Sequence, residues 1–231
     1  MPQPRPAQPN DVVLALEASC RASSIALASR GQTAFKALDP ACSHASDLLP
    51  ALAELLSAAQ LNPADITRII VGTGPGSYTG LRVASSLAQG LARGSDADLV
   101  GIPSGEGLAF GHLQAGAECV HLLDARAGQL TYARYRRLPA DIRVITDPKV
   151  VEPAELTSSM FTGTALFADE STLAAADHAA LDSATSISAA PPRADHLLAL
   201  DCSRRSCGQS LASSSIAPLY LRPYAARIRR R

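Results

Sequence analysis

Short apolar runs separated by polar turns fill the first forty residues. Val12–Ala18 is an apolar run that ends at an acid, Ser24–Ser29 alternates apolar and polar positions, and Thr33–Leu38 continues the pattern. The turns at Ser19–Ser23 and Arg30–Gln32 are short. Connections of that length join antiparallel neighbours, so the three segments predict an antiparallel meander.

Helical and extended patterns alternate over the next sixty residues. Ser46–Gln60 carries leucines at helical spacing, which predicts one buried helix face formed by Leu48, Leu52, Leu55 and Leu56. Arg68–Val71 is an apolar strand that leads into a glycine-rich loop, Thr79–Arg93 is a second helix, and Asp98–Ile102 is a further strand. A meander joined to parallel strands needs helices across it, so we expect an α/β fold with a mixed, α+β-like sheet.

A similar order of elements begins again near residue 120. Val120–Asp124 is an apolar strand that ends at an acid, Gln129–Arg136 alternates, and Arg143–Thr146 is a candidate third strand. The strings LALEAS…SIALAS and HLLDAR…LTYARY share an apolar strand, an acid followed by alanine, and a second strand. This repetition predicts two structurally related lobes.

The remaining pattern is weaker. We expect a strand and turn at Phe161–Ala165, a helix at Arg193–Cys202, a loop at Ser210–Ser215 and an ordered segment at Ala217–Arg222. The chain is thereby divided into a proline-rich disordered arm at 1–10, a first lobe at 11–103, a smaller second lobe at 104–216, and a C-terminal segment at 217–231 that returns to the lobes and ends in a basic tail.

Composition narrows the classes of function. The 231 residues carry 21 Lys+Arg and 21 Asp+Glu, so a globally basic nucleic-acid binder is not expected. Hydrophobic residues make up 47% of the chain, which is enough for a core and argues against disorder. Five cysteines, no secretory pattern and no apolar run of about 18 residues indicate a cytoplasmic protein with reduced thiols and no membrane span.

The glycine-rich loop is the main candidate for chemistry. It reads GTGPGSYTGLR, and its end lies at a helix N-terminus, where free N–H groups attract anions. Ser77 or Thr79 can cap that helix. The P-loop, the dinucleotide-binding pattern and the nucleophile elbow are all absent. Two interpretations stay open, a phosphate cradle and a tight turn packed on a neighbour, for the loop residues Gly72, Thr73, Gly74, Pro75, Gly76, Ser77, Tyr78, Thr79, Gly80 and Arg82.

The whole loop string resembles the GxGPGS(F/Y)TGLR signature of the TsaB family, also called YeaZ. Further segments resemble family motifs in the same order along the chain. LALEAS is similar to the opening LAIDTS strand, HASDLLP to the HSExLLP helix start, DARAGQLTY to DARxGEVY, and PLYLR to the C-terminal PxYLR. The matches span residues 14–222, with 137–210 covered by position alone.

The resemblance implies an actin-like, Hsp70-like ATPase (ASKHA) fold of two related lobes. It also implies a noncatalytic subunit of the bacterial machinery that makes threonylcarbamoyladenosine beside the anticodon of tRNA. Such a subunit pairs with a TsaD-type threonylcarbamoyltransferase, a TsaE-type ATPase joins them, and tRNA is reached through the complex. The chain is expected to require no cofactor of its own, and ATP, ADP or the adenylate is a candidate ligand of the shared interface. Whether nucleotide binds this chain or only that interface stays open, as does the choice between a monomer and a homodimer for the chain alone.

Two residues depart from the family pattern. Glu17 stands where the family has Asp, at the acid that helps to hold metal-bound phosphate in actin-like ATPases, and Gln129 stands where the family has Glu. The longer Glu17 side chain displaces the carboxylate, so ATP hydrolysis by this chain is not expected, whereas nucleotide binding stays open. Asp124 is the second candidate for a phosphate-side acid. An autonomous actin-like nucleotide hydrolase remains the alternative function.

The histidine pattern does not support metal chemistry. TsaD-type subunits carry an HxxxH-type motif, whereas no two of the five histidines here are four residues apart. We therefore expect no metal site. A metalloprotease, the third alternative, lacks its ligands.

The resemblance also implies a partner interface on helices of the first lobe. Small residues at i, i+4 steps, including Ala84 and Ala88, let either the chain's own sheet or a partner helix approach closely. The expected interface residues are His44, Leu48, Leu52, Leu55, Ala84 and Ala88. The C-terminal arginines are either a solvated terminus or a weak, salt-sensitive contact with tRNA phosphates.

Overall fold

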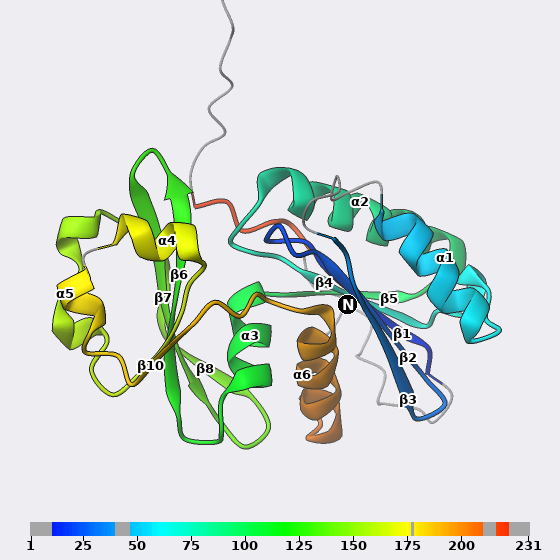
Figure 1. The fold of residues 1–231 in the computed structure, drawn as a ribbon. Helices are drawn as coiled ribbons and strands as arrows, with labels where there is room; N and C mark the ends of the chain where they lie inside the picture. The colour runs from blue at the N-terminus through cyan, green and yellow to red at the C-terminus, as the bar shows by residue number, and fades with distance from the viewer. Residues whose placement is uncertain (1–10, 40–46, 177, 210–215, 222–231) are drawn as a thin grey trace, which may run out of the picture.

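Two five-stranded sheets form the frame of the computed structural model, which describes residues 11–39, 47–176, 178–209 and 216–221 (Figure 1). The first sheet has the strand order β3-β2-β1-β4-β5. In it, β1, β2 and β3 form an antiparallel meander, while β4 and β5 continue parallel to β1. The bounds are β1 Val13–Glu17, β2 Ser24–Ser29, β3 Gln32–Ala37, β4 Arg68–Gly72 and β5 Asp98–Ile102.

The second sheet repeats this topology with the order β10-β9-β6-β7-β8. Strands β6, β7 and β8 form the meander, β9 runs parallel to β6, and β10 runs parallel to β9. The bounds are β6 Glu118–Arg126, β7 Gln129–Arg137, β8 Ile142–Val151, β9 Ala165–Phe167 and β10 Ser186–Ser188. Two lobes of like topology are thereby confirmed.

Helices cover one outer face of each sheet. On the first sheet these are α1 (Leu48–Ala58) and α2 (Tyr78–Ser95), linked by a short 3-10 turn (Pro63–Asp65) and β4. On the second sheet they are α4 (Glu170–Ala175) and α5 (His178–Leu181), beside 3-10 turns at Pro153–Glu155 and Ser158–Met160.

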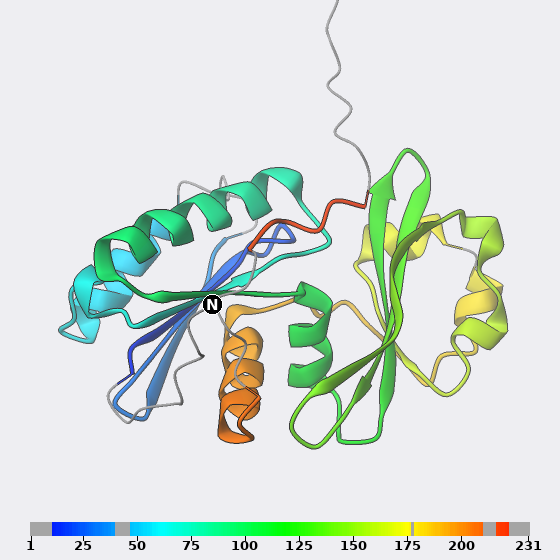
Figure 2. The ribbon, with the colours of Figure 1, turned by 180° about the vertical axis from the view of Figure 1, so that it is seen from behind.

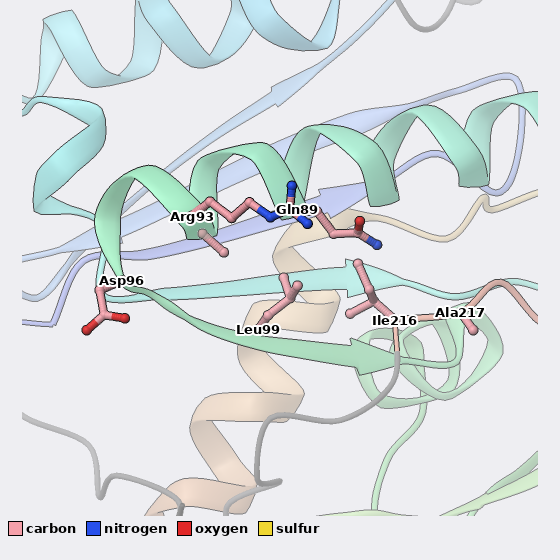
Figure 3. A pocket seen from close by; sticks show the side chains of 7 residues that line it. Gln89, Arg93, Asp96, Leu99, Ile216 and Ala217 are labelled. Atoms are coloured by element: carbon pink, nitrogen blue, oxygen red, sulfur yellow. The ribbon is translucent and has the colours of Figure 1, made fainter.

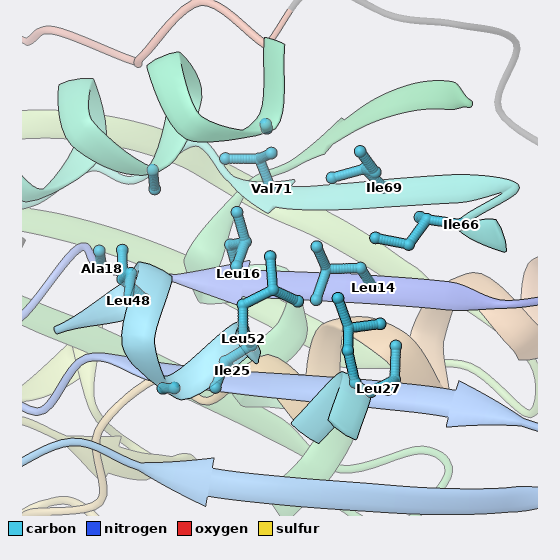
Figure 4. Close-up of a cluster of buried hydrophobic side chains, with 14 of the residues drawn as sticks. Leu14, Leu16, Ala18, Ile25, Leu27, Leu48, Leu52, Ile66, Ile69 and Val71 are labelled. Atoms are coloured by element: carbon cyan, nitrogen blue, oxygen red, sulfur yellow. The ribbon is translucent and has the colours of Figure 1, made fainter. Parts of the chain in front are cut away.

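The side chains of β1 are buried on both faces of the first sheet, so helices must cover both faces. Leu14 and Leu16 point into the core beneath α1 and α2, together with Leu48 and Leu52 of α1 (Figure 4). Val13 and Ala15 point to the opposite face, since successive side chains of a strand alternate. A strand buried on both faces reads as a continuous apolar run, as Val12–Leu16 does.

Two helices, α3 (Ser104–His112) and α6 (Ala194–Ser206), form the layer between the sheets (Figures 1 and 2). Leu197 and Leu200 of α6 and Leu108 of α3 share one apolar cluster with residues from both sheets. Although α6 follows the second sheet in sequence, it packs on strands β1 and β2 of the first. Residues far apart in sequence therefore build the middle of the molecule.

Buried ion pairs fix α6 in this position. The Arg68 guanidinium on β4 donates two hydrogen bonds to the Asp201 carboxylate on α6, Nε to Oδ2 at 2.9 Å and Nη2 to Oδ1 at 2.7 Å. Both side chains are fully buried. One turn on, Arg204 donates to Glu106 of α3 at 2.6 Å and to Asp141 before β8 at 2.7 Å. Asp201 thus ties α6 to the first sheet, and Arg204 ties it to α3 and the second sheet.

Most elements expected from the pattern are present, and one expectation needs correction. The order of strands and helices over 11–102 is confirmed, and the third strand of the second meander extends to Val151. The strand expected at Phe161–Ala165 is wrong. That segment is a turn in which Thr164 Oγ1 donates to the Phe161 carbonyl at 2.8 Å and Gly163 has φ +73°, and the strand begins only at Ala165.

The segment expected to be ordered at Ala217–Arg222 is described up to Leu221, where it forms neither helix nor strand, and Arg222 lies outside the described residues. Helix α3 had no prediction, because its glycines weaken the helical signal. The disordered arm at 1–10 and the loop at 210–215 lie outside the described residues.

Asp201→Asn is expected to lower the free energy of unfolding by about 3–5 kcal/mol, since it removes the carboxylate that accepts two hydrogen bonds from buried Arg68 and leaves only the Asp98 carboxylate, 3.9 Å away. Chemical denaturation with urea measures this. The matched control is Glu54→Gln at the exposed Lys36–Glu54 pair, which should cost at most about 1 kcal/mol. Replacing both buried partners, as in Arg68→Met with Asp201→Leu, should restore most of the loss. Equal effects of Asp201→Asn and Glu54→Gln on the free energy of unfolding would contradict the assignment of Arg68–Asp201 as a stabilising buried pair.

Candidate functional site

The glycine-rich loop lies at the carboxyl ends of the parallel strands β1, β4 and β5, between β4 and α2. This is the edge of an α/β sheet at which ligands most often bind. Gly74 has φ +88°, a left-handed conformation that favours glycine. Gly76 and Gly80 lie against the turn after β1: a Cβ on Gly76 would be 2.0 Å from the Ser19 carbonyl oxygen, and one on Gly80 would be 2.1 Å from that of Ala18. The loop is therefore glycine-rich because it packs closely on its own chain.

Three backbone donors of the loop bind oxygens of the protein itself. The N–H of Thr73 donates to the Ile102 carbonyl at 2.9 Å, and that of Ser77 donates to the Ser19 carbonyl at 2.6 Å. The N–H of Gly74 donates to Ser104 Oγ at 3.1 Å. These groups would have to leave their partners to bind a phosphate. Of the two interpretations left open by the sequence, the packed turn is the one that this geometry favours.

Glu17, the expected phosphate-side acid, is sealed beneath the loop. Its side chain is fully buried, Oε1 accepts the Ser19 N–H at 2.7 Å, and Oε2 has no hydrogen-bond partner among the described residues. Burial raises the pKa of this carboxyl, and the hydrogen bonds from Ser19 offset only part of the shift. A Cβ on Gly72 would be 2.1 Å from Oε2, so the carboxyl lies directly against Gly72.

Asp124, the second expected acid, lies at the exposed end of β6 in the other sheet. Its Oδ1 accepts the Arg126 N–H at 2.7 Å, and its Oδ2 lies 3.4 Å from the Arg126 guanidinium. Mg²⁺ bound to nucleotide needs exposed oxygen ligands. A buried Glu17 below a closed loop and an exposed Asp124 paired locally do not fit a Mg²⁺–nucleotide on this chain. Across the described ranges, no group of three or more His, Cys, Asp and Glu side chains is arranged to hold a metal ion.

Ser77 caps α2, with its Oγ accepting the Gly80 N–H at 3.3 Å, while Thr79 is exposed. The helix then meets the C-terminal segment 216–221, which runs back along it. Ser85 Oγ donates to the Ile216 carbonyl at 3.2 Å, and the Leu219 N–H donates to the Thr73 carbonyl at 2.8 Å. Two motifs far apart in the sequence therefore form one structural unit. The sequence analysis expected the C-terminal segment to return to the lobes, but it did not predict this contact with the loop and α2.

Tyr78 and Arg82 lie on the outer side of this unit. The ring of Tyr78 stacks on that of Tyr220, with centroids 4.9 Å apart and planes at 34°. The Arg82 guanidinium carbon lies 4.6 Å from the centre of the Tyr78 ring. Tyr78 and Arg82 were among the expected loop residues, whereas Tyr220 was not among the expected site residues.

The expected interface side chains lie mostly inside the protein. Leu48 and Leu52 of α1 and Ala84 and Ala88 of α2 are buried in the core of the first sheet. Leu55 is half-buried against the same core, and His44 lies outside the described residues. These four buried side chains cannot contact a partner directly. The outer surface of the two helices is instead formed by exposed residues, including Leu49, Ala53, Ser57, Ser86 and Gly90.

A hollow of about 630 Å³ lies at the far end of α2 from the glycine loop (Figure 3). Gln89, Arg93 and Asp96 line it on the helix side, and Leu99 of β5 with Ile216 and Ala217 lines it on the other. It is open to solvent and has one charge of each sign.

Among the helices that the structure describes, none combines the length and the apolar character needed to cross a bilayer.

Comparison with known proteins gives one consistent group. Residues 40–203 match the family model described as TsaD, tRNA N6-adenosine threonylcarbamoyltransferase. The chain is 31% identical over 128 residues to the tRNA threonylcarbamoyladenosine biosynthesis protein TsaB of Escherichia coli, covering 54% of this chain and 55% of that protein. It is 34% identical over 93 residues to TsaB of Bacillus subtilis, covering 40% and 41%. The chain thus matches about half the length of these curated relatives or less.

Solved structures extend the likeness to the whole fold. YeaZ from Pseudomonas aeruginosa superposes with a TM-score of 0.73 at 22% identity, covering 91% of this chain and 100% of that one. A second structure from the same organism, titled as similar to peptidase YEAZ, gives a TM-score of 0.74 at 22% identity, with 92% and 100% covered. The chain therefore has the fold of these YeaZ structures, with two lobes of repeated sheet topology.

Gly76→Ala is expected to lower the free energy of unfolding by about 1–3 kcal/mol, because the added methyl group would meet the Ser19 backbone. The matched control is Gly90→Ala in exposed helix α2, where a Cβ meets nothing within 4 Å. That change should raise stability by about 0.5–1 kcal/mol, since alanine is the better helix former. Thermal and urea unfolding of both variants measure the difference. A destabilisation shared by both would argue against a loop closed on Ser19.

The stability contribution of Glu17 is expected to fall as pH rises. Below its usual value of 4.5 the carboxyl is protonated in the folded and unfolded states. Above pH 4.5 the carboxyl ionises in the unfolded state before it ionises in the folded state, because burial raises its folded-state pKa. The free energy of unfolding therefore falls as the pH rises from 4.5 toward that raised pKa. Burial lowers the pKa of His121 and His196 from 6.5 to about 4. Between these two pH values the histidines therefore raise the free energy of unfolding as the pH rises, opposite to the effect of Glu17.

The difference between the parent and Glu17→Gln isolates the carboxyl, since the histidines are common to both. Urea titrations at a series of pH values should show the variant gaining on the parent as pH rises above 4.5. A constant difference across the series would mean that Glu17 is not buried in the folded state.

Proposed function

This chain belongs to the TsaB (YeaZ) family, and from that premise we propose that it is a noncatalytic subunit for threonylcarbamoyladenosine formation in tRNA. In this proposal it forms a heterodimer with a TsaD-type threonylcarbamoyltransferase, and a TsaE-type ATPase joins the pair. The partner supplies the chemistry, and this chain activates it by binding. Nucleotide or adenylate lies on the partner or at the shared interface, and this chain requires no cofactor of its own.

The observation that carries a noncatalytic role is the closed glycine loop above the buried Glu17. The donors of Thr73 and Ser77 are engaged by the chain's own carbonyls, and the acid below them has no route to solvent. A general acid, a metal ligand or a phosphate clamp must be exposed to its substrate. The residues that would do chemistry in an actin-like ATPase here stabilise the packing of β1, β4 and α2.

The outer surface of α1 and α2 supports the heterodimer. Leu49 is 57% exposed, and its exposed neighbours on α1 include Ala53 and Ser57. On α2, Ser86 and Gly90 are small and exposed. The acid of this α1 surface, Glu54, is paired with Lys36. Small, uncharged positions on two adjacent helices allow the helices of a partner to pack closely, as in a bundle.

Reconstitution tests the proposal. A TsaD-type partner, its TsaE-type ATPase and the threonylcarbamoyl-adenylate are incubated with tRNA, with and without this chain, and modified adenosine is measured. Product should form only when this chain is present, and this chain alone should form none. Equal product without it would overturn the role. Mg²⁺-dependent ATP hydrolysis by this chain alone, reduced by Glu17→Gln, would instead support the alternative, an autonomous hydrolase.

Ala53→Arg is expected to weaken the heterodimer at least tenfold, because it places a long charged side chain on the proposed interface. The matched control is Ala174→Arg, at an exposed alanine of α4 on the other lobe. Isothermal titration with the TsaD-type partner measures both. A loss of affinity in both variants or in neither would place the interface elsewhere.

A further inference from the structure

Four basic side chains lie together on one face of the second sheet, on its neighbouring strands β7 and β8. The register pairs Arg136 of β7 with Arg143 of β8, and it pairs Lys149 of β8 with Tyr132 of β7. Residues two apart along a strand share a face, as do directly paired residues, so Arg134 lies on this face as well. We call Arg134, Arg136, Arg143 and Lys149 the basic face.

The positive charge of the basic face is only partly offset. Glu118 of β6 accepts a hydrogen bond from Arg134 Nε at 2.6 Å and another from Arg136 Nε at 2.7 Å, so one carboxylate is shared between two guanidinium groups. Arg143 and Lys149 are exposed, and neither forms an ion pair with any residue that the structure describes. The chain as a whole carries no net charge, so this excess of positive charge is local.

The charges of the basic face are placed at a cost to the fold. Like charges directly opposite each other on neighbouring strands are destabilising, and Arg136 lies directly opposite Arg143. Asp147, the acid within β8, is not ion-paired to either of them in the described part of the chain. An anion from outside the protein would therefore relieve their repulsion and gain charge-assisted hydrogen bonds from both guanidinium groups.

The basic face is long and open, which bears on the size of that anion. Arg143 and Lys149 are six residues apart on β8, which at about 3.3 Å per residue corresponds to at most about 20 Å of extended strand. A single phosphate or a small carboxylate cannot contact both ends. A nucleic-acid backbone carries a phosphate for about every 3.4 Å of duplex axis on each strand, so it presents several across this distance.

From this juxtaposition we infer that the basic face binds the phosphate backbone of a folded RNA, with phosphates at Arg136, Arg143 and Lys149. A guanidinium group donates two parallel hydrogen bonds to a phosphate, and such contacts position an RNA without reading its sequence. Tyr132, the aromatic side chain on this face, is buried and offers no ring to a base. A specific protein interface has an apolar core, whereas the side chain opposite Arg134 on this face is that of a threonine at position 146.

The position of the basic face is compatible with the proposed heterodimer. The inference rests on the proposed function for the identity of the RNA, a tRNA. Helices α3 and α6 lie between the second sheet, which carries the basic face, and the first sheet, which α1 and α2 cover on its outer side (Figures 1 and 2). A partner bound to α1 and α2 would therefore leave the basic face open to RNA.

The test measures binding of a fluorescently labelled tRNA transcript to the full chain, by anisotropy over a salt series from about 50 to 200 mM. Arg143→Gln should weaken binding about three- to tenfold at the lowest salt and reduce the slope of log affinity against log salt by about 1. Lys149→Gln should have an effect of the same size, whereas Arg143→Lys, which keeps the charge, should stay within about twofold of the parent. Arg30→Gln, at an exposed arginine between β2 and β3 of the first lobe, is the matched control and should also stay within about twofold.

Unchanged affinity and salt slope for Arg143→Gln and Lys149→Gln, or an equal loss for Arg30→Gln, would overturn the inference. Heterodimer assembly with the TsaD-type partner is measured on the same variants. If Arg143→Gln weakens assembly and leaves tRNA binding unchanged, the basic face is a protein contact, and the RNA inference fails while the proposed function stands. If tRNA binding depends on Arg143 as expected but reconstitution gives equal product without this chain, the proposed function fails and the basic face remains an RNA-binding surface.

Discussion

The buried pairing of Arg68 with Asp201 is the contact on which the arrangement of the two lobes depends. It joins the centre of the first sheet to a helix that follows the second sheet in sequence, across 133 residues. A charge that is taken out of water must be matched by its partner in good geometry, so α6 has one allowed position on β4. Once α6 is fixed there, Arg204 reaches Glu106 and Asp141, and the second sheet is held against α3 and α6.

The same close packing explains why a motif that looks like a phosphate cradle does not behave as one. Glycines let a backbone approach a ligand, and they equally let it approach another part of its own chain. Here Gly72 makes room for the Glu17 carboxyl, and Gly76 and Gly80 make room for the carbonyls of Ser19 and Ala18. At these three positions the space beside the glycine Cα is therefore occupied by other atoms of the same chain.

Local patterns predicted what depends on local physics. The alternation in β2, the apolar run of β1 and the leucines of α1 set the element order over 11–102, and the repeated strand–acid–turn–strand string indicated two like lobes. Contacts between residues far apart in the sequence could not be predicted from these local patterns. Helix α3 contains glycines, which weaken a helix but here let it pack closely on α6, since a Cβ on Gly107 would lie 2.6 Å from Leu197 Cδ2. The burial of Glu17 and the stacking of Tyr220 on Tyr78 join residues whose separation in sequence hides their contact. The resemblance to a family located the loop but could not show that its donors were already engaged.

The C-terminal segment lies on the glycine loop through the hydrogen bond from Leu219 to Thr73, and this has a consequence for how the chain folds during synthesis. The first sheet emerges from the ribosome early, with one apolar face covered by α1 and α2. Its other face, formed in part by Val13 and Ala15, stays uncovered until α6 has been made, and the loop is completed only when residues 216–221 follow. The first sheet can therefore bury its second apolar face only after α6 has been synthesised, although its strands are among the first residues made.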